Sequence, residues 1–254
     1  MAEDLRRSAA GAAGVVTQVN HWQGGLAELP DDIWQPGVEV LILADNALTE
    51  LPARIGSLRR LHTLDLGHNR LTSLPPEIGE LTGLSRCLYL HDNRLTSLPE
   101  SLGRLGRLRY LNVGDNPLGE LPGSLGGLTS LVELRAQRSR LSALPDSLGE
   151  LTSLRELWLR GNRLTGFPPG VRDLRELREV ELRENRFREI PGGLRGLPRL
   201  RRVDLRGNQV RTLPRWLAEL PALEKLDLRW NPLEAGGCAA VTEELERHGC
   251  VVLR

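Results

Sequence analysis

The chain repeats the stretch Leu61-His-Thr-Leu64-Asp-Leu66-Gly-His-Asn69-Arg-Leu71-Thr-Ser-Leu74-Pro75, with small changes, along most of its 254 residues. The asparagine of this stretch recurs at Asn46, Asn69, Asn93, Asn116, Asn162, Asn185, Asn208 and Asn231. The step is 23 residues, except for 24 between Asn69 and Asn93 and for the gap where Ser139 replaces an asparagine. A fixed period of this length indicates a solenoid, in which each unit stacks on the next.

The alternation within each unit predicts a short strand. In Leu64-Asp65-Leu66 the two leucines point to one side and the aspartate to the other. One such strand cannot bury its own leucines, so neighbouring units must stack into a parallel sheet with a spacing of ~4.8 Å. The asparagine follows the strand where the chain turns, and its amide can pair with backbone groups of two units, forming a ladder. A serine replaces only part of this hydrogen bonding, so the rung at Ser139 should be weaker.

The unit continues with x-x-Ile/Leu-Gly-x-Leu, as in Ile78-Gly-Glu-Leu81. The whole pattern resembles leucine-rich-repeat proteins, and the 23-residue unit resembles the subclass in Ras-suppressor and Scribble-like scaffolds and in bacterial cytoplasmic repeat proteins. The resemblance implies an α/β fold: a curved, right-handed leucine-rich-repeat solenoid. Its concave side carries a parallel β-sheet, its convex side short helical or 3-10 turns, and its ends helical caps.

The repeat divides the chain into three parts. Residues 1–37 should hold an N-terminal helical cap, with a helix over 2–13, and a degenerate first repeat. Residues 38–233 should hold nine repeats. Residues 234–254 should form a C-terminal cap, with a helix over 239–248 that stops at Gly249 and a strand over 250–253.

Composition argues against several functional classes. The net charge is +1, so bulk charge indicates neither a nucleic acid nor a membrane partner. The first residues lack the apolar run of a secretory signal, and no apolar stretch approaches the ~20 residues of a membrane span. Three cysteines do not make a disulfide framework, so we expect a cytoplasmic protein with Cys238 and Cys250 as buried thiols rather than a disulfide.

The residues predicted on the concave face are the ones that indicate function, because core packing does not dictate which residues occupy those positions. Equivalent residues of successive units should stack in columns across this face, which places both tyrosines and two tryptophans beside arginines. Such groupings are typical of protein-binding hot spots, although aromatic residues also suit strands in general. The predicted partner-binding residues are Tyr89, His91, Tyr110, Arg135, Trp158, Arg160, Arg183, Arg206, Arg229 and Trp230.

The predicted function is therefore non-catalytic protein–protein interaction, as a scaffold with a protein or peptide partner on the concave face. One alternative is recognition of an anionic ligand, a phosphopeptide or nucleic acid, by the ladder Arg160, Arg183, Arg206 and Arg229. The same ladder could instead form an ion-pair lattice with Glu181, Asp204 and Asp227. Another alternative is a structural subunit of a larger assembly. The sequence leaves the oligomeric state open.

Catalytic motifs are absent from the sequence. It has no phosphate loop, no His-Glu-x-x-His, no Gly-x-Ser-x-Gly and no paired Cys-x-x-Cys, so we expect no enzyme, no cofactor and no metal. Asp45, His68, Asp92 and Asp115 fall in one column beside His91 and are metal-ligand types, but polar strand-end residues explain them better. Cys87 lies in the unit with the inserted residue, so the pattern does not fix which side of the sheet its side chain faces. The insertion should bulge the sheet near Tyr89.

Overall fold

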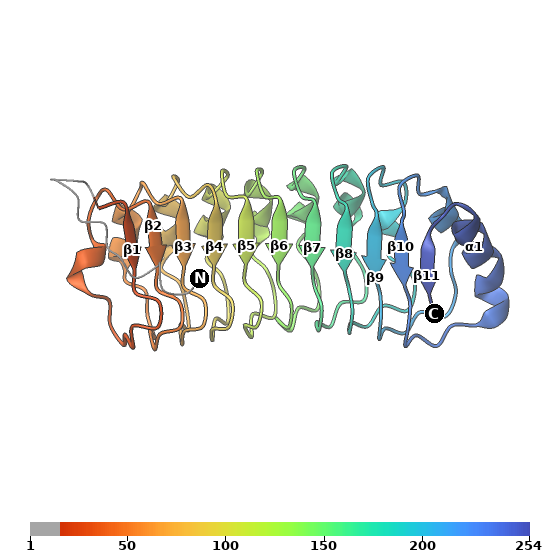
Figure 1. Ribbon diagram of the computed structural model, residues 1–254, viewed down its shortest axis with the longest axis horizontal. Coiled ribbons are helices and arrows are strands. Elements are labelled where there is room, and N and C mark those ends of the chain that lie inside the picture. Colours follow the sequence, from red (N-terminus) through yellow and green to blue (C-terminus); the bar gives the residue numbers. More distant parts are fainter. Residues whose placement is uncertain (1–15) are drawn as a thin grey trace.

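The structure, a computed structural model, describes residues 16–254. In this part of the chain eleven strands form one parallel sheet, in which every strand pairs with its neighbour in the sequence (Figure 1). The strands are β1 (Gln18–Asn20), β2 (Val40–Ile42), β3 (Thr63–Asp65), β4 (Cys87–Tyr89), β5 (Tyr110–Asn112), β6 (Glu133–Arg135), β7 (Glu156–Trp158), β8 (Glu179–Glu181), β9 (Arg202–Asp204), β10 (Lys225–Asp227) and β11 (Val251–Leu253). The predicted curved solenoid is confirmed.

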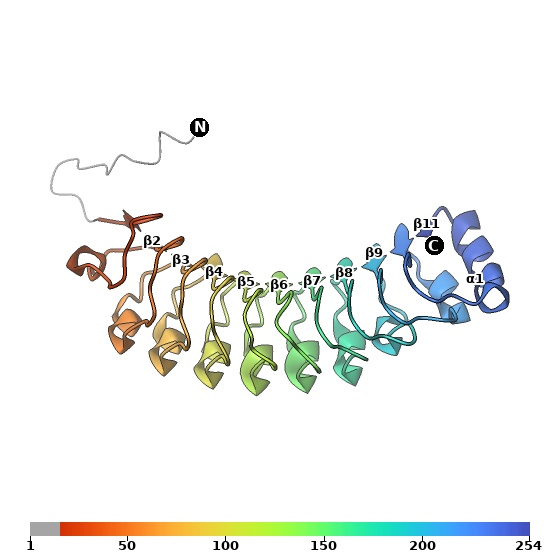
Figure 2. The ribbon, with the colours of Figure 1, turned by 90° about the horizontal axis from the view of Figure 1, so that it is seen from below.

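Short 3-10 helices lie on the convex side of the arch, opposite the sheet (Figure 2). They are η2 (Asp31–Ile33), η3 (Ala53–Ser57), η4 (Pro76–Glu80), η5 (Glu100–Arg104), η6 (Gly123–Gly127), η7 (Asp146–Glu150), η8 (Pro169–Asp173), η9 (Gly192–Leu194) and η10 (Arg215–Glu219). Each of them follows a proline, such as Pro75 before η4. Proline fixes φ and cannot donate to a ladder, so it ends the extended stretch and sets the start of the turn.

The core fills the space between the sheet and the 3-10 helices. Leu64, Leu66 and Leu71 are fully buried, and the leucines of the other units follow them down the solenoid. Full burial of one such side chain contributes roughly 1.5–3 kcal/mol. Because each unit packs only on its two neighbours, the fold depends on this continuous column of leucines.

The asparagine ladder joins neighbouring units. The Nδ2 of Asn69 donates to the carbonyl oxygen of Leu43 in the previous unit at 2.9 Å and to that of Leu66 at 3.1 Å. Its Oδ1 accepts from the backbone N–H of Leu48 at 3.1 Å. The hydroxyl of Ser139 instead reaches the carbonyl of Val113 at 3.4 Å and that of Gln137 at 3.1 Å. This rung makes fewer and longer contacts.

The residue before each ladder position has a positive φ. This left-handed conformation occurs at Asp45, His68, Asp92, Asp115, Arg138, Gly161, Glu184, Gly207 and Trp230. Glycine adopts it freely, and aspartate and histidine are enriched in it among other residues. The left-handed backbone conformation therefore accounts for the Asp and His residues at these positions without a metal ion.

The C-terminal helix α1 (Ala235–Arg247) begins four residues before the expected start. Gly236 and Gly237, which the expected helix left out, lie in its first turn. Glycine fits at position 237 because a Cβ atom there would lie 2.9 Å from the side chain of Thr212. Gly249 has φ +85° and ends the helix, and β11 then pairs with β10. The helix expected over residues 2–13 lies outside the described residues.

The residue inserted before β4 does not bulge the sheet near Tyr89, so that expectation was wrong. Asp65 pairs with Tyr89, and Tyr89 with Asn112, in unbroken register. The chain absorbs the extra residue around Ser85, before the strand begins and where no ladder hydrogen bond constrains it. Cys87 is half-buried on the concave face, between Thr63 and Tyr110 of the adjacent strands.

Candidate functional site

A row of stacked side chains crosses strands β4 to β7 on the concave face. The rings of Tyr89 and Tyr110 have centroids 5.0 Å apart. The guanidinium of Arg135 lies 5.8 Å from the ring centroid of Tyr110 and 5.0 Å from that of Trp158. We call these four residues the aromatic strip. Within the described part of the chain, no element covers this face of the sheet (Figure 2).

Neighbouring carboxylates hold the aromatic strip in place. The Nε of Arg135 donates to Glu133 at 2.5 Å, and the indole Nε1 of Trp158 donates to Glu156 at 3.3 Å. Burial raises the pKa of Tyr110, so its hydroxyl stays protonated at neutral pH. A surface whose side chains are already fixed loses less conformational entropy when a partner binds.

His91, two residues beyond the end of β4, extends the strip. Its ring lies 6.1 Å from that of Tyr89 and 4.7 Å from that of His68, in edge-on geometry. Burial lowers the pKa of His91, and its Nδ1 is buried without a hydrogen-bond partner among the described residues. The ring is therefore largely neutral at physiological pH.

The carboxylates in the column of Asp45, His68, Asp92 and Asp115 are engaged by other side chains. Asp45 accepts from the indole of Trp22 at 2.8 Å, and Asp92 lies 2.6 Å from the Nδ1 of His68. Asp115 accepts from the Nε of Arg138. Over residues 16–254 no three His, Cys, Asp or Glu side chains are grouped so that they could hold a metal ion.

The arginine ladder lies along one side of strands β7 to β10, and each of its members has a carboxylate within 4.0 Å. The pairs are Arg160 with Glu184 at 2.9 Å, Arg183 with Glu181 at 3.4 Å, Arg206 with Asp204 at 2.5 Å and Asp227 at 3.5 Å, and Arg229 with Asp227 at 2.7 Å. Burial would raise the pKa of Asp227, but the hydrogen bonds from Arg229 and the charge of Arg206 outweigh it and lower that pKa. The ladder is thus a network of internal ion pairs.

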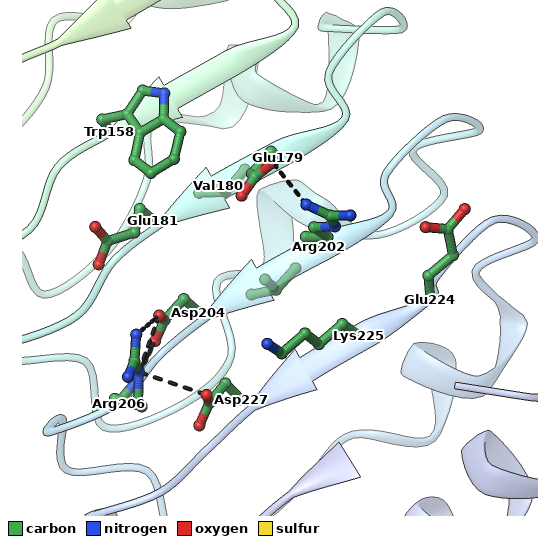
Figure 3. Close-up of a pocket in the computed structure, with 11 residues that line it drawn as sticks. Trp158, Glu179, Val180, Glu181, Arg202, Asp204, Arg206, Glu224, Lys225 and Asp227 are labelled. Carbon is green, nitrogen blue, oxygen red and sulfur yellow. Dashed lines mark hydrogen bonds and ion pairs between the residues drawn. The ribbon is translucent and has the colours of Figure 1, made fainter. Parts of the chain in front are cut away.

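A depression of about 530 Å³ lies on strands β8 to β10, beside the end of the aromatic strip (Figure 3). Trp158 stands at one end of it, next to Glu181. Its walls include Glu179, Glu181, Arg202, Asp204, Lys225 and Asp227.

Two exposed tryptophans mark the ends of the concave face. Trp230 is 71% exposed and has φ +62°, a conformation that is rare for a bulky residue. Arg229 and Arg206 lie 5.7 Å and 6.0 Å from its ring. Trp22, which sequence reasoning missed, is 52% exposed at the opposite end. The backbone N–H of Gln23 there donates to the carbonyl oxygen of Ala44 in the next unit.

The predicted site residues thus fall into two groups. Tyr89, His91, Tyr110, Arg135 and Trp158 contact one another across β4 to β7. Arg160, Arg183, Arg206, Arg229 and Trp230 follow the carboxyl ends of β7 to β10. Trp158 and Arg160 belong to the same strand unit, which is where the two groups meet.

Three family models match the chain and together reach from residue 36 to residue 233. A model described as leucine-rich repeat region matches residues 85–189, one described as leucine rich repeat matches 175–233, and one described as two copies of leucine rich repeats matches 36–83. No curated protein matches the chain. Eleven parallel strands in one curved sheet agree with these models.

Solved structures with the same fold include two plant receptors. One is a plant peptide hormone receptor, RGFR1, in complex with RGF2, at 31% identity and a TM-score of 0.72, with 81% of this chain and 34% of that one covered. The other is the ectodomain of the receptor kinase GASSHO1/SCHENGEN3 from Arabidopsis thaliana in complex with CASPARIAN STRIP INTEGRITY FACTOR 2, at 30% identity and a TM-score of 0.74, with 86% and 27% covered. The chain therefore spans about a third or less of these receptor chains.

A bacterial structure shares the fold at lower identity. The functional domain of InlJ from Listeria monocytogenes is 22% identical, has a TM-score of 0.73, and is matched over 89% of this chain and 47% of that one. Over residues 16–254 of this chain, the structure contains no helix with the length and apolar character that crossing a membrane requires.

Proposed function

The chain is a leucine-rich-repeat protein, and from that premise we propose that it is a non-catalytic binding module whose concave face takes a protein or peptide partner. The partner would lie across the aromatic strip. The observation that carries this proposal is the unbroken contact of Tyr89, Tyr110, Arg135 and Trp158 on a sheet face that no described element covers.

The composition of the strip supports the proposal. Tryptophan, tyrosine and arginine dominate the binding energy of protein interfaces, and they do so where neighbouring contacts exclude water. The side chains of the strip are half-buried and fixed, so they offer apolar area at a low entropic cost. The two plant receptors are each in complex with a partner, which supports a binding role for this chain.

We do not extend the proposal to an anionic ligand. The four arginines of the ladder already have carboxylate partners, and a phosphate would have to displace them. A role as a structural subunit has no specific observation in its favour. We also propose that the chain belongs to the 23-residue subclass, because β4 to β10 begin at intervals of 23 residues.

We propose a cytoplasmic location for this binding module. The ground is the state of its cysteines: Cys87, Cys238 and Cys250 are all free. Free buried thiols fit a reducing compartment. Fractionation of the native cell with an antibody against the chain tests this, and recovery of the protein only in the medium or the envelope would contradict it.

The binding proposal is tested by affinity capture from the native cell. The variant Tyr110→Ala with Trp158→Ala should lose the captured partner while its circular dichroism spectrum stays unchanged. A matched control is Arg104→Ala with Arg172→Ala, which removes two exposed side chains from the convex helices η5 and η8. Capture that survives in the aromatic variant, or is lost equally in the control, would contradict the proposal.

A further inference from the structure

The depression on β8 to β10 is lined mainly by charged side chains. Its lining includes the carboxylates Glu179, Glu181, Asp204, Glu224 and Asp227 and the cations Arg202, Arg206 and Lys225. Each of these carboxylates has an arginine of the chain within 4.0 Å, and the pairs are Glu179 with Arg202, Glu181 with Arg183, Asp204 with Arg206, Glu224 with Arg201 and Asp227 with Arg229. The volume of the depression, about 530 Å³, lies within the range of pockets that take small ligands, roughly 300–1,000 Å³.

Among the lining carboxylates, Glu181 has a buried oxygen that lacks a hydrogen bond within the described residues. Its side chain is only 14% exposed. The Nε of Arg183 lies 3.4 Å from its Oε1 but outside hydrogen-bond geometry, and both atoms are buried without a hydrogen-bond partner in the described residues. A buried polar atom without a hydrogen bond is unfavourable, so a donor that reaches the carboxylate of Glu181 would be favourable.

Trp158 provides an aromatic wall next to that carboxylate. It pairs in register with Glu181, and Figure 3 shows the two side by side at the end of the depression. Arg135 lies over the ring at 5.0 Å, and no other cation of the described residues does. Because Arg135 comes from β6, on the far side of β7 from the depression, the β8 side of Trp158 is left to a partner.

The sheet already shows how it holds a guanidinium. Arg135 lies against the rings of Tyr110 and Trp158, and its Nε donates to the carboxylate of Glu133. One strand further on, the ring of Trp158 again lies beside a carboxylate, that of Glu181, which Arg183 approaches to 3.4 Å without a hydrogen bond. A planar guanidinium can stack on the ring and donate to the carboxylate at once, which an ammonium cannot do.

We propose that the depression binds the guanidinium of an arginine side chain of the partner, stacked on Trp158 and hydrogen-bonded to Glu181. This rests on the proposed function, since it states the chemistry of the partner at one end of the aromatic strip. One segment of the partner would lie on Tyr110 and Arg135. An arginine next to that segment would then enter the depression.

The test uses small probes and the full chain, so it does not depend on finding the partner. N-acetyl-L-arginine amide is titrated to about 50 mM while the tryptophan indole N–H resonances are followed by NMR. The resonance of Trp158, assigned by its loss in Trp158→Phe, should shift with saturation. The citrulline analogue, which is neutral and has nearly the same shape, should bind about tenfold more weakly.

Two variants locate the probe. Glu181→Gln should weaken binding of the arginine amide about tenfold, whereas Glu184→Gln, which changes an exposed carboxylate of the same strand unit, should leave it unchanged. Equal binding of the two probes, an equal effect of the two variants, or no shift of Trp158 would overturn the inference. Strip-dependent capture of a partner would survive any of these results, so the two proposals fail separately.

Discussion

The imidazole of His91 occupies the space above Gly67 of the neighbouring strand, where a Cβ atom would lie 2.5 Å from the Cε1 of the ring. The two residues stand at equivalent positions of successive units, just after β3 and β4. Glycine at this position leaves room for His91 to lie over the preceding unit, where its ring is 4.7 Å from that of His68. Gly114 has the same relationship to Gln137 of the unit that follows it. A Cβ atom on Gly114 would lie 2.4 Å from the side-chain amide of Gln137.

Gly67→Ala should displace His91, because contacts below 3.0 Å require one atom to move. We expect a loss of roughly 1 kcal/mol in the free energy of unfolding and a shift of the His91 ring resonances. Urea unfolding and NMR measure the two effects. Gly166→Ala is the control, since a Cβ there meets nothing within 4 Å. A Gly67→Ala protein as stable as this control would show that the His91 ring is not confined.

Asn162→Ala should destabilise the solenoid more than Ser139→Ala in the adjacent rung. The Oδ1 of Asn162 accepts from the backbone N–H groups of Ser139 and Leu141, and its Nδ2 donates to the carbonyls of Ala136 and Leu159. Its loss leaves buried backbone groups unpaired, which we expect to cost about 3 kcal/mol against about 1 kcal/mol for the serine. Equal losses in thermal unfolding would refute the ladder's role.

The protein should lose stability as the pH falls through the titration of His91. Burial lowers the pKa of this imidazole, so the unfolded chain takes up the proton first and is favoured by acid. The contribution of neutral His91 is complete above its ordinary pKa of about 6.5 and is lost as the pH falls through the lowered value. Urea unfolding at about pH 7.5 and pH 5.5 measures this.

His91→Gln should show a smaller drop between these two pH values than the natural chain. The control is His248→Gln, at the end of α1, which should keep the full drop. If His91→Gln loses as much stability on acidification as the natural chain, then groups other than His91 cause the pH dependence.

Asp227→Asn should break the ion-pair network of the arginine ladder. The Asp227 side chain is 3% exposed and pairs with both Arg206 and Arg229. Removing its charge leaves two guanidiniums facing each other, which we expect to cost about 2 kcal/mol. Glu184→Gln, whose side chain is 50% exposed, should cost less than about 0.5 kcal/mol. Phosphate that binds the natural ladder tightly would contradict this reading of it.

Sequence reasoning reached the fold because the repeat itself encodes it. The positions of Leu64, Leu66 and Asn69 recur with a fixed period, and each position has one physical role that does not depend on distant residues. The same regularity placed Asn112, Arg135 and Trp158 side by side, and the strand register confirms those neighbours. Columns on a stacked sheet follow from the period alone.

What the period does not encode was harder to predict. Trp22 escaped notice because its unit is 22 residues long and the strand part of that unit keeps only Val19 of the usual apolar residues. The effect of the insertion before β4 depended on whether Ser85 or the strand would absorb it. The depression beside Trp158 depends on the rotamers of Glu181 and its neighbours, which no spacing specifies.

Site-specific photo-crosslinking in the native cell tests most directly whether a partner lies on the concave face. A benzophenone side chain is placed either at Arg138, 57% exposed beside the aromatic strip, or at Arg172 on the convex helix η8. We predict a crosslinked partner from position 138 and none from position 172. Crosslinking from position 172 alone, or equally from both positions, would contradict a concave binding face.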